Sequence, residues 1–238
     1  MRSGGSGIRF GAPSLTPTIK VLIIVNVVVW LLQVLTQRWI NAADWFGVVP
    51  VRVLHGWIWQ PFTYMFLHSP GDPFHLLFNM LMLWMFGGEL ERHWGGRAFL
   101  RYYIVCGAGA GIAAVIFGLA VSGMATIPTI GASGAIYGLF VAFGMVFAER
   151  QVLFMLIFPM KARTMALILF GIAFFYAMTQ PSSGVSHIAH LGGAVVGFLY
   201  LKRAWRLGAF YRELRWKMQR RKFKVTRPPD DDFDRWVH

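Results

Sequence analysis

Two side chains that can do chemistry together, Ser133 and His190, each lie deep in a stretch without charge. Ser133 lies in a Gly-Ala-Ser-Gly sequence, and no Asp, Glu, Lys or Arg occurs from residue 102 to residue 148. His190 lies in a His-Ile-Ala-His-Leu-Gly-Gly sequence, inside a second run without these residues, from 164 to 201. Polar and ionisable groups are costly at bilayer depth and are usually functional there. A hydroxyl and an imidazole on separate apolar spans therefore suggest a nucleophile and a base within a membrane.

The backbone around the serine is predicted to be irregular. Pro128 and Gly131 precede Ser133 and favour a break, which is tolerated at membrane depth where protein buries it or where it lines water. Ser133 would then begin a helix, and the free N–H groups of the first turn could stabilise an oxyanion. The alternative is an N-cap serine in a packing turn of small residues, because serine is a preferred cap.

The histidine belongs to a pair, His187 and His190, which are three residues apart and share one face of a helix. A neutral imidazole at His190 near Ser133 could accept the serine proton as a general base. The alternatives are a pore or proton-relay histidine and a metal-binding pair. A metal site is weakly supported, since there are two close ligands and no acidic residue nearby in the sequence.

A third polar pair, His75 and Asn79, lies at positions i and i+4 of a predicted helix. Both side chains can donate hydrogen bonds, which suits an oxyanion hole better than acid–base work. The alternative is that they join helices through hydrogen bonds, a common use of Asn and His in membranes.

Small residues recur every four positions beside the serine and the histidine. They are Gly134, Gly138 and Ala142 in one span, and Ala189, Gly193 and Gly197 in the other. Such ridges let two helices approach closely. Alone they indicate only packed spans, but beside Ser133 and His190 they would bring the two side chains within reach of each other.

The composition predicts a multi-pass membrane protein. The chain of 238 residues is 56% hydrophobic and 14% charged, and its mean hydropathy is +0.53. Residues 202–238 hold 12 Lys and Arg against 5 Asp and Glu, a net charge of +7 in a total of +13. A basic segment directly after a last span indicates a cytoplasmic anchor that touches anionic lipid, and we expect no nucleic acid. Cys106 is the sole cysteine, so the chain forms no internal disulfide.

Six spans are predicted from the apolar stretches. The run of 47 residues from 102 to 148 exceeds one crossing of about 20 residues, so it holds two spans. The break between them is expected at 124–131. The other spans are predicted at about 19–35, 74–86, 165–178 and 185–201. The span at 74–86 ends in the sequence Gly87-Gly88-Glu89-Leu90-Glu91-Arg92. The aromatic-rich first loop, 36–73, suits the membrane interface.

The distribution of Lys and Arg along the chain predicts its orientation in the membrane. They gather in the N-terminal tail, in the 89–101 and 149–163 connections and in the C-terminal tail. The 121–131 and 180–186 connections carry none, and the long first loop carries two. Because Lys and Arg accumulate on the cytoplasmic side, both termini are predicted to be cytoplasmic.

Four motifs together resemble those of the rhomboid family of intramembrane serine proteases. In chain order they are HxxxN at 75–79, GxxxE at 87–91, GxSG at 131–134 and AHxxG at 189–193. The resemblance covers residues 57–201. It implies an all-α membrane protein with a six-transmembrane-helix, rhomboid-like bundle, both termini in the cytoplasm and a long interfacial first loop. We expect a flexible cytoplasmic N-tail at 1–16, the six-span domain at 17–204 and a basic cytoplasmic C-tail at 205–238.

The resemblance also implies roles for individual residues. Ser133 would be the nucleophile and His190 the general base of a dyad without a third acid. The oxyanion hole would use the side chains of His75 and Asn79 and the backbone N–H of Ser133. The predicted supporting residues are Tyr137, which packs against the base, Gly193 beneath the histidine, Gly131 and His187. Glu91 would make structural hydrogen bonds, and His68 would line the cavity. Trp59-Gln60 stands where the family often has Trp-Arg, with one cation fewer.

The expected activity is serine endopeptidase cleavage in or near transmembrane segments of other membrane proteins. Substrates should carry helix-weakening residues, because the carbonyls of an intact helix are hydrogen-bonded and shielded. We expect lateral access near span five with 180–186 as a lid, membrane lipid as a further partner, and no cofactor or metal. The expected location is a bacterial cytoplasmic membrane. The alternatives are a catalytically silent rhomboid-like chaperone, which would lack the serine or histidine, and a channel or transporter.

Overall fold

The computed structural model describes residues 15–154, 157–179 and 187–203, and most of them are helical. The long helices are α1 (Pro17–Thr36), α7 (Gly96–Ala120) and α9 (Ala162–Thr179), each long and apolar enough to cross a membrane. The shorter apolar helix α8 (Ser133–Val146) packs against both α7 and α9. Residues 187–203 are also helical. The segment between α1 and α7 holds α5 (Pro73–Met82), the π-helical turn η2 (Leu83–Gly87) and α6 (Gly88–Trp94).

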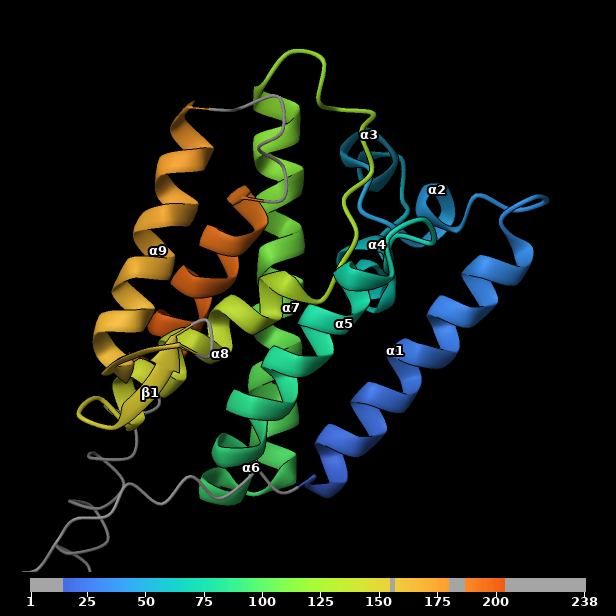
Figure 1. Cartoon of the computed structure of the whole chain (residues 1–238). Coiled ribbons are helices and arrows are strands. Elements are labelled where there is room, and N and C mark those ends of the chain that lie inside the picture. Colours follow the sequence, from blue (N-terminus) through green and yellow to red (C-terminus); the bar gives the residue numbers. More distant parts are fainter. Residues whose placement is uncertain (1–14, 155–156, 180–186, 204–238) are drawn as a thin grey trace, which may run out of the picture. The chain divides into compact units, whose positions relative to one another are not determined.

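The helices alternate in direction (Figure 1). Helices α1, α7 and α9 begin at one end of the bundle, whereas α5–α6, α8 and residues 187–200 run the opposite way. The connection between α7 and α8 descends from the end of α7 into the bundle before α8 begins (Figure 1). The break predicted at 124–131 is confirmed, since this segment is irregular and α8 starts at Ser133.

The second predicted span is longer than expected. The sequence suggested an end at Gly87-Gly88, but the chain stays helical through η2 and α6 to Trp94. Gly87 is needed for packing, because a Cβ there would lie 2.6 Å from Ile19 Cδ1 and 3.1 Å from Phe99 Cζ. The glycine therefore lets α1 and α7 approach this helix and does not end it.

Glu91 in α6 caps the N-terminus of α1. Its carboxylate accepts hydrogen bonds from Thr16 Oγ1, from Thr18 N at 2.9 Å and from Ile19 N at 3.0 Å. The first N–H groups of a helix lack partners within the helix, and its N-terminus favours negative charge. The structural hydrogen-bonding role expected for Glu91 is confirmed by these contacts.

The first loop folds into short helical turns. They are α2 (Ala42–Phe46), α3 (Pro50–Leu54), α4 (Gln60–Thr63) and the 3₁₀ turn η1 (Tyr64–Phe66). Its large apolar side chains are widely exposed, Trp39 at 80% and Ile58 at 73%, as suits a segment in the membrane interface. Val48 pairs with Thr129 through two backbone hydrogen bonds, so this loop holds the connection that leads to Ser133.

A β-hairpin between α8 and α9 was not expected from the sequence. Strands β1 (Gln151–Phe154) and β2 (Phe158–Lys161) pair antiparallel, and β2 leads directly into α9. The sequence indicated only a cation-bearing connection at 149–163.

By its internal contacts the chain divides into one unit at 1–200 and another at 201–238. Most of the N-tail at 1–16, the lid expected at 180–186, the first residues of span six and the C-tail at 205–238 lie outside the described residues. The proposed division into tail, domain and tail stays a prediction.

Candidate active site

The serine and the histidine singled out in the sequence are in direct contact. Ser133 Oγ lies 2.7 Å from His190 Nε2, although 57 residues separate them in the chain. Ser133 is the first residue of α8, and His190 lies in the first turn of the described part of helix 187–203. This distance is within the usual range for a hydrogen bond. The geometry brings together the two side chains that could act as nucleophile and base.

Gly131 shapes the turn that presents the serine. Its φ angle of +119° is one that L side chains rarely adopt, and its N–H donates to the Tyr64 carbonyl at 3.0 Å. A Cβ on Gly131 would lie 2.8 Å from His75 Nε2 and 3.7 Å from Ser133 Oγ. The glycine therefore makes room for the His75 ring next to the serine.

Glycines bring α8 and helix 187–203 into backbone contact. A Cβ on Gly193 would lie only 1.9 Å from the Gly134 carbonyl oxygen, and one on Gly138 would lie 3.2 Å from the Gly193 oxygen. A Cβ on Gly197 would lie 3.2 Å from Gly138 Cα. The close approach predicted from the small-residue ridges is confirmed. Gly193 lies directly against the Gly134 backbone.

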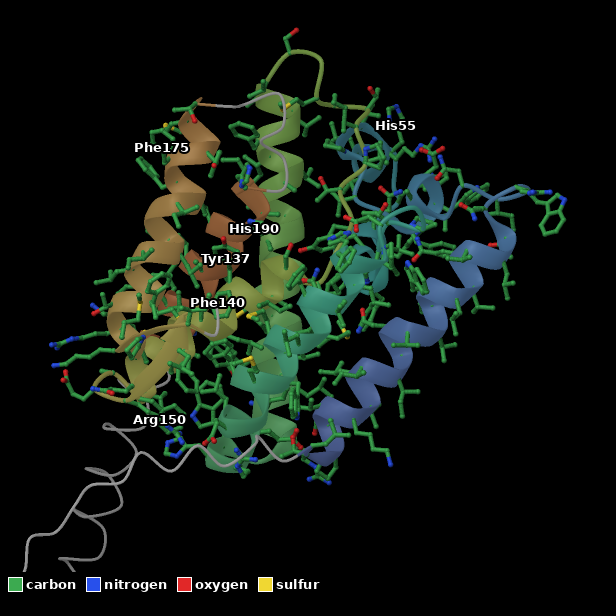
Figure 2. The ribbon with its side chains drawn as sticks, viewed as in Figure 1. His55, Tyr137, Phe140, Arg150, Phe175 and His190 are labelled. Carbon is green, nitrogen blue, oxygen red and sulfur yellow. The ribbon has the colours of Figure 1, made fainter. Side chains whose placement is uncertain are left out.

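Two aromatic rings, those of Tyr137 and His187, pack against the His190 imidazole. Tyr137, one turn after Ser133, stacks on it with ring centroids 4.2 Å apart and planes 6° apart (Figure 2). His187 contacts it edge-on at 5.8 Å and itself stacks on Tyr176 of α9 at 5.1 Å. The Nδ1 atom of His190 is buried and has no hydrogen-bond partner in the part of the chain that the structure describes. The Tyr137 ring therefore packs against the histidine, and its role in supporting the base stays a prediction.

His75 presents a donor towards this site. Its Nδ1 accepts a hydrogen bond from the Ser69 backbone N–H at 3.3 Å, so the neutral ring carries its proton on Nε2. That Nε2 atom and Ser133 Oγ both border the space beside Gly131. A proton on Nε2 suits the donor role expected for His75.

Asn79 is near the site, but its side chain is turned to its own helix. It is largely buried on α5, and its Nδ2 donates to the His75 carbonyl at 2.7 Å. Among the described residues, no hydrogen bond joins Asn79 to Ser133 or His190. Its expected role in an oxyanion hole stays a prediction that requires the side chain to turn.

His68 lies behind His75, with ring centroids 5.0 Å apart. It is fully buried, and neither ring nitrogen has a hydrogen-bond partner within the described residues. Burial lowers the pKa of His68 to about 3, and the nearby His75 adds to the effect. His68 is therefore a neutral imidazole in the wall behind the site.

Two residues that position the site have no strong signal in the sequence. Tyr64, seen there only as one of many loop aromatics, holds Gly131 through its carbonyl and donates its hydroxyl to the Gly107 carbonyl at 2.8 Å. Gln60 is fully buried; its Oε1 accepts from Val49 N at 3.0 Å and its Nε2 donates to the Asp44 carbonyl at 3.1 Å. Gln60 thus fastens the first loop without the charge of an arginine.

These features define an integral membrane protein in which two apolar helices bring a serine into hydrogen-bonding contact with a histidine. The Rhomboid domain model matches residues 55–206. The chain therefore belongs to the rhomboid family.

Relatives named as rhomboid proteases share about a third of their aligned residues with this chain. The putative rhomboid protease YdcA of Bacillus subtilis is 31% identical over 191 residues, which cover 78% of this chain and 87% of YdcA. The rhomboid protease AarA of Providencia stuartii is 29% identical over 207 residues, 79% of this chain and 72% of AarA. The rhomboid protease GluP of Bacillus subtilis is 30% identical over 146 residues, 61% of this chain and 26% of GluP. The chain thus spans about a quarter of GluP.

Proposed function

We propose that this protein is an intramembrane serine endopeptidase that cleaves other membrane proteins in or near their transmembrane segments. The observation that carries the proposal is the contact of 2.7 Å between Ser133 Oγ, at the start of α8, and His190 Nε2, in the first described turn of helix 187–203. Membership of a family with several members named as proteases supports the same reaction class.

The two side chains would divide the chemistry as nucleophile and base. His190 Nε2 accepts the Ser133 hydroxyl proton while Oγ attacks the scissile carbonyl carbon, forming a tetrahedral intermediate. When the C–N bond breaks, His190 returns the proton to the leaving amine. Water then attacks the acyl-serine, giving a proton to His190, and the Ser133 Oγ leaves with that proton. In this scheme the Tyr137 ring keeps the imidazole plane in place without a carboxylate partner.

The negative charge that forms on the carbonyl oxygen needs donors. The backbone N–H of Ser133 is in the first turn of α8, where N–H groups have no partner within the helix. His75 Nε2 borders the same turn and would add its N–H, and Asn79 would add its amide after a change of rotamer. Each well-placed donor of this kind contributes about 100-fold to 1000-fold in rate.

We place the site in a bundle of six spans with both termini in the cytoplasm. The alternating helix directions in Figure 1 and the cations at one end of the bundle support this topology. Ser133 and His190 then open to the non-cytoplasmic side, from which the hydrolytic water comes. Substrates would be transmembrane segments weakened by Gly, Pro or small residues, and the membrane would be the bacterial cytoplasmic membrane.

A catalytically silent membrane chaperone is the second candidate in this family. The present chain keeps Ser133, His190, His75 and Asn79, and the first two are in contact, which favours the protease.

The test is cleavage of a transmembrane reporter by the purified full chain in liposomes. Ser133→Ala and His190→Ala should each abolish cleavage. His187→Ala is the matched control, since His187 is three residues away on the same face and does not contact the serine in the described part of the chain; it should retain measurable cleavage. Cleavage at the parental rate by both Ser133→Ala and His190→Ala would refute the proposal. Capture of the reporter without cleavage by all of these proteins would favour the chaperone.

A further inference from the structure

The β1–β2 hairpin has a gradient of polarity along its length. Its strand pairs run from Gln151 opposite Lys161 at the base to Phe154 opposite Phe158 near the tip. Between them, Val152 pairs with Met160 and Leu153 with Pro159. Because paired residues share a face and neighbouring pairs alternate, both faces are apolar beyond the base. A hairpin that lies on a water-facing surface would instead keep one face polar.

The apolar part of the hairpin is exposed. Ile157 is 69% exposed and Phe158 57%. A two-stranded hairpin is at best marginally stable in water, so these exposed apolar residues call for a covering environment. The hairpin contacts α9, and this contact leaves Ile157 and Phe158 exposed within the described residues.

The base of the hairpin is bordered by cations. Glu149 pairs with Lys161 at 2.7 Å and with Arg163 at 2.8 Å. Glu89 pairs with Arg92 at 2.7 Å and with Arg150 at 2.9 Å; Figure 2 places Arg150 at the same end of the bundle as the hairpin. Each carboxylate is shared by two cations, so this cluster of six side chains keeps two positive charges in excess.

The chain itself limits the depth of the hairpin. Its base follows directly on the cytoplasmic end of α8 in the proposed topology, and β2 passes into α9 without a break at Ala162. Both outer strand edges carry backbone N–H and C=O groups that need partners, and such edges do not occur in the hydrocarbon region when they face lipid. The apolar tip needs an apolar environment, whereas the open strand edges and the basic border need polar partners. All three needs are met at one depth in the bilayer, the boundary between headgroups and acyl chains.

We propose that residues 151–154 and 157–161 form an interfacial anchor, which inserts its apolar end into the leaflet on the cation-rich side while Arg150, Lys161 and Arg163 lie among anionic phospholipid headgroups. Basic groups near a surface attract anionic lipid, and the apolar side chains gain from burial among acyl chains. Since β2 continues into α9, the anchor sets the depth of that helix in the bilayer. The partner is the lipid surface.

Depth measurement on the full chain in vesicles tests the anchor. Cys106 is the sole cysteine, so Cys106→Ala gives a background for one NBD label at Ile157→Cys or, as a second reporter, Phe158→Cys. Gln151→Cys at the base is the matched control. In phosphatidylcholine–phosphatidylglycerol vesicles, the two apolar positions should emit at shorter wavelength than the control. They should also be quenched by lipids with a doxyl group at the fifth acyl carbon, and protected from iodide in the buffer.

Iodide quenching at Ile157 and Phe158 equal to that at Gln151 would overturn the anchor and leave the hairpin as a surface for another protein. The contribution of Arg150, Lys161 and Arg163 is tested separately by changing the lipid charge. Replacing phosphatidylglycerol by phosphatidylcholine should weaken the doxyl quenching, and a depth independent of lipid charge would overturn that part. These readouts do not use proteolysis, so they are independent of the proposed enzymatic function.

Discussion

Gly193→Ala tests whether backbone contact between α8 and helix 187–203 holds the serine–histidine pair. In the present structure the added Cβ would lie 1.9 Å from the Gly134 carbonyl oxygen. Real Cβ atoms essentially never approach a heavy atom closer than 3.0 Å, so the two backbones must separate by about 1.1 Å, the difference of these distances. Backbone on both sides leaves no flexible side chain to absorb the change.

The expected loss of activity can be worked out because Ser133 and His190 lie on the same two helices as Gly134 and Gly193. Ser133 precedes Gly134 by one residue and His190 precedes Gly193 by three. If the separation of about 1.1 Å is transmitted, the Oγ–Nε2 distance grows from 2.7 Å to roughly 3.8 Å, beyond hydrogen-bonding range. A misplacement of about 1 Å at a reacting group costs on the order of 100-fold in rate. Overpacking should also cost about 1–3 kcal/mol of stability.

The assay is reporter cleavage in liposomes, with kcat and KM measured separately and thermal unfolding measured in parallel. We expect kcat to fall about 100-fold with a smaller change in KM, because the substitution displaces the reacting side chains from each other. Gly171→Ala in α9 is the control, since among the described residues the added Cβ would meet nothing within 4 Å beyond its chain neighbours and the adjacent backbone of its own helix; it should match the parent. Parental kcat in Gly193→Ala would show that this backbone contact does not position Ser133 and His190.

Three further changes have definite expected results. Glu91→Gln removes the charge that caps α1 and should lower the free energy of unfolding by about 1.5–3 kcal/mol, measured by denaturant titration in detergent. The control is Glu89→Gln, which weakens partly exposed ion pairs and should lower the free energy of unfolding by less than about 1 kcal/mol. Gly131→Ala should abolish cleavage, since its Cβ would meet His75 Nε2 at 2.8 Å and φ is +119°; a variant as active as the parent would contradict the turn geometry. His68, neutral in the fold with a pKa of about 3, takes up a proton in the unfolded chain below its ordinary pKa of 6.5. Stability should therefore fall as pH drops below 6.5, and His68→Asn should remove about 1.4 kcal/mol of the loss between pH 7.5 and 5.5; an unchanged loss would count against a neutral buried His68.

The helical spans and the serine–histidine contact follow from the sequence because lipid imposes strong patterns. A run of 47 uncharged residues cannot be one crossing, and small residues every four positions indicate where helices touch. Gly87 shows the limit of such patterns. It suggests a helix end, yet it serves close packing against Ile19 and Phe99, which only the tertiary arrangement reveals.

Contacts made by the backbone leave little trace in the sequence. Tyr64 holds Gly131 through its carbonyl oxygen, a group that every residue has, so no residue type signals it. In the sequence Gln60 is only a neutral residue at a position where the family often has arginine. In the fold its side-chain oxygen and nitrogen both make hydrogen bonds within the first loop. The β-hairpin was missed because its strands have four residues each and lie between cations that mark a connection.

Covalent labelling of Ser133 shows directly whether His190 activates this serine. The full chain in detergent is treated with a fluorophosphonate, and the adduct is located by peptide mass spectrometry. We expect one adduct, on Ser133, whose formation is lost in His190→Ala and retained in His187→Ala. An adduct on another residue, or labelling of Ser133 at the parental rate in His190→Ala, would contradict a serine activated by this histidine.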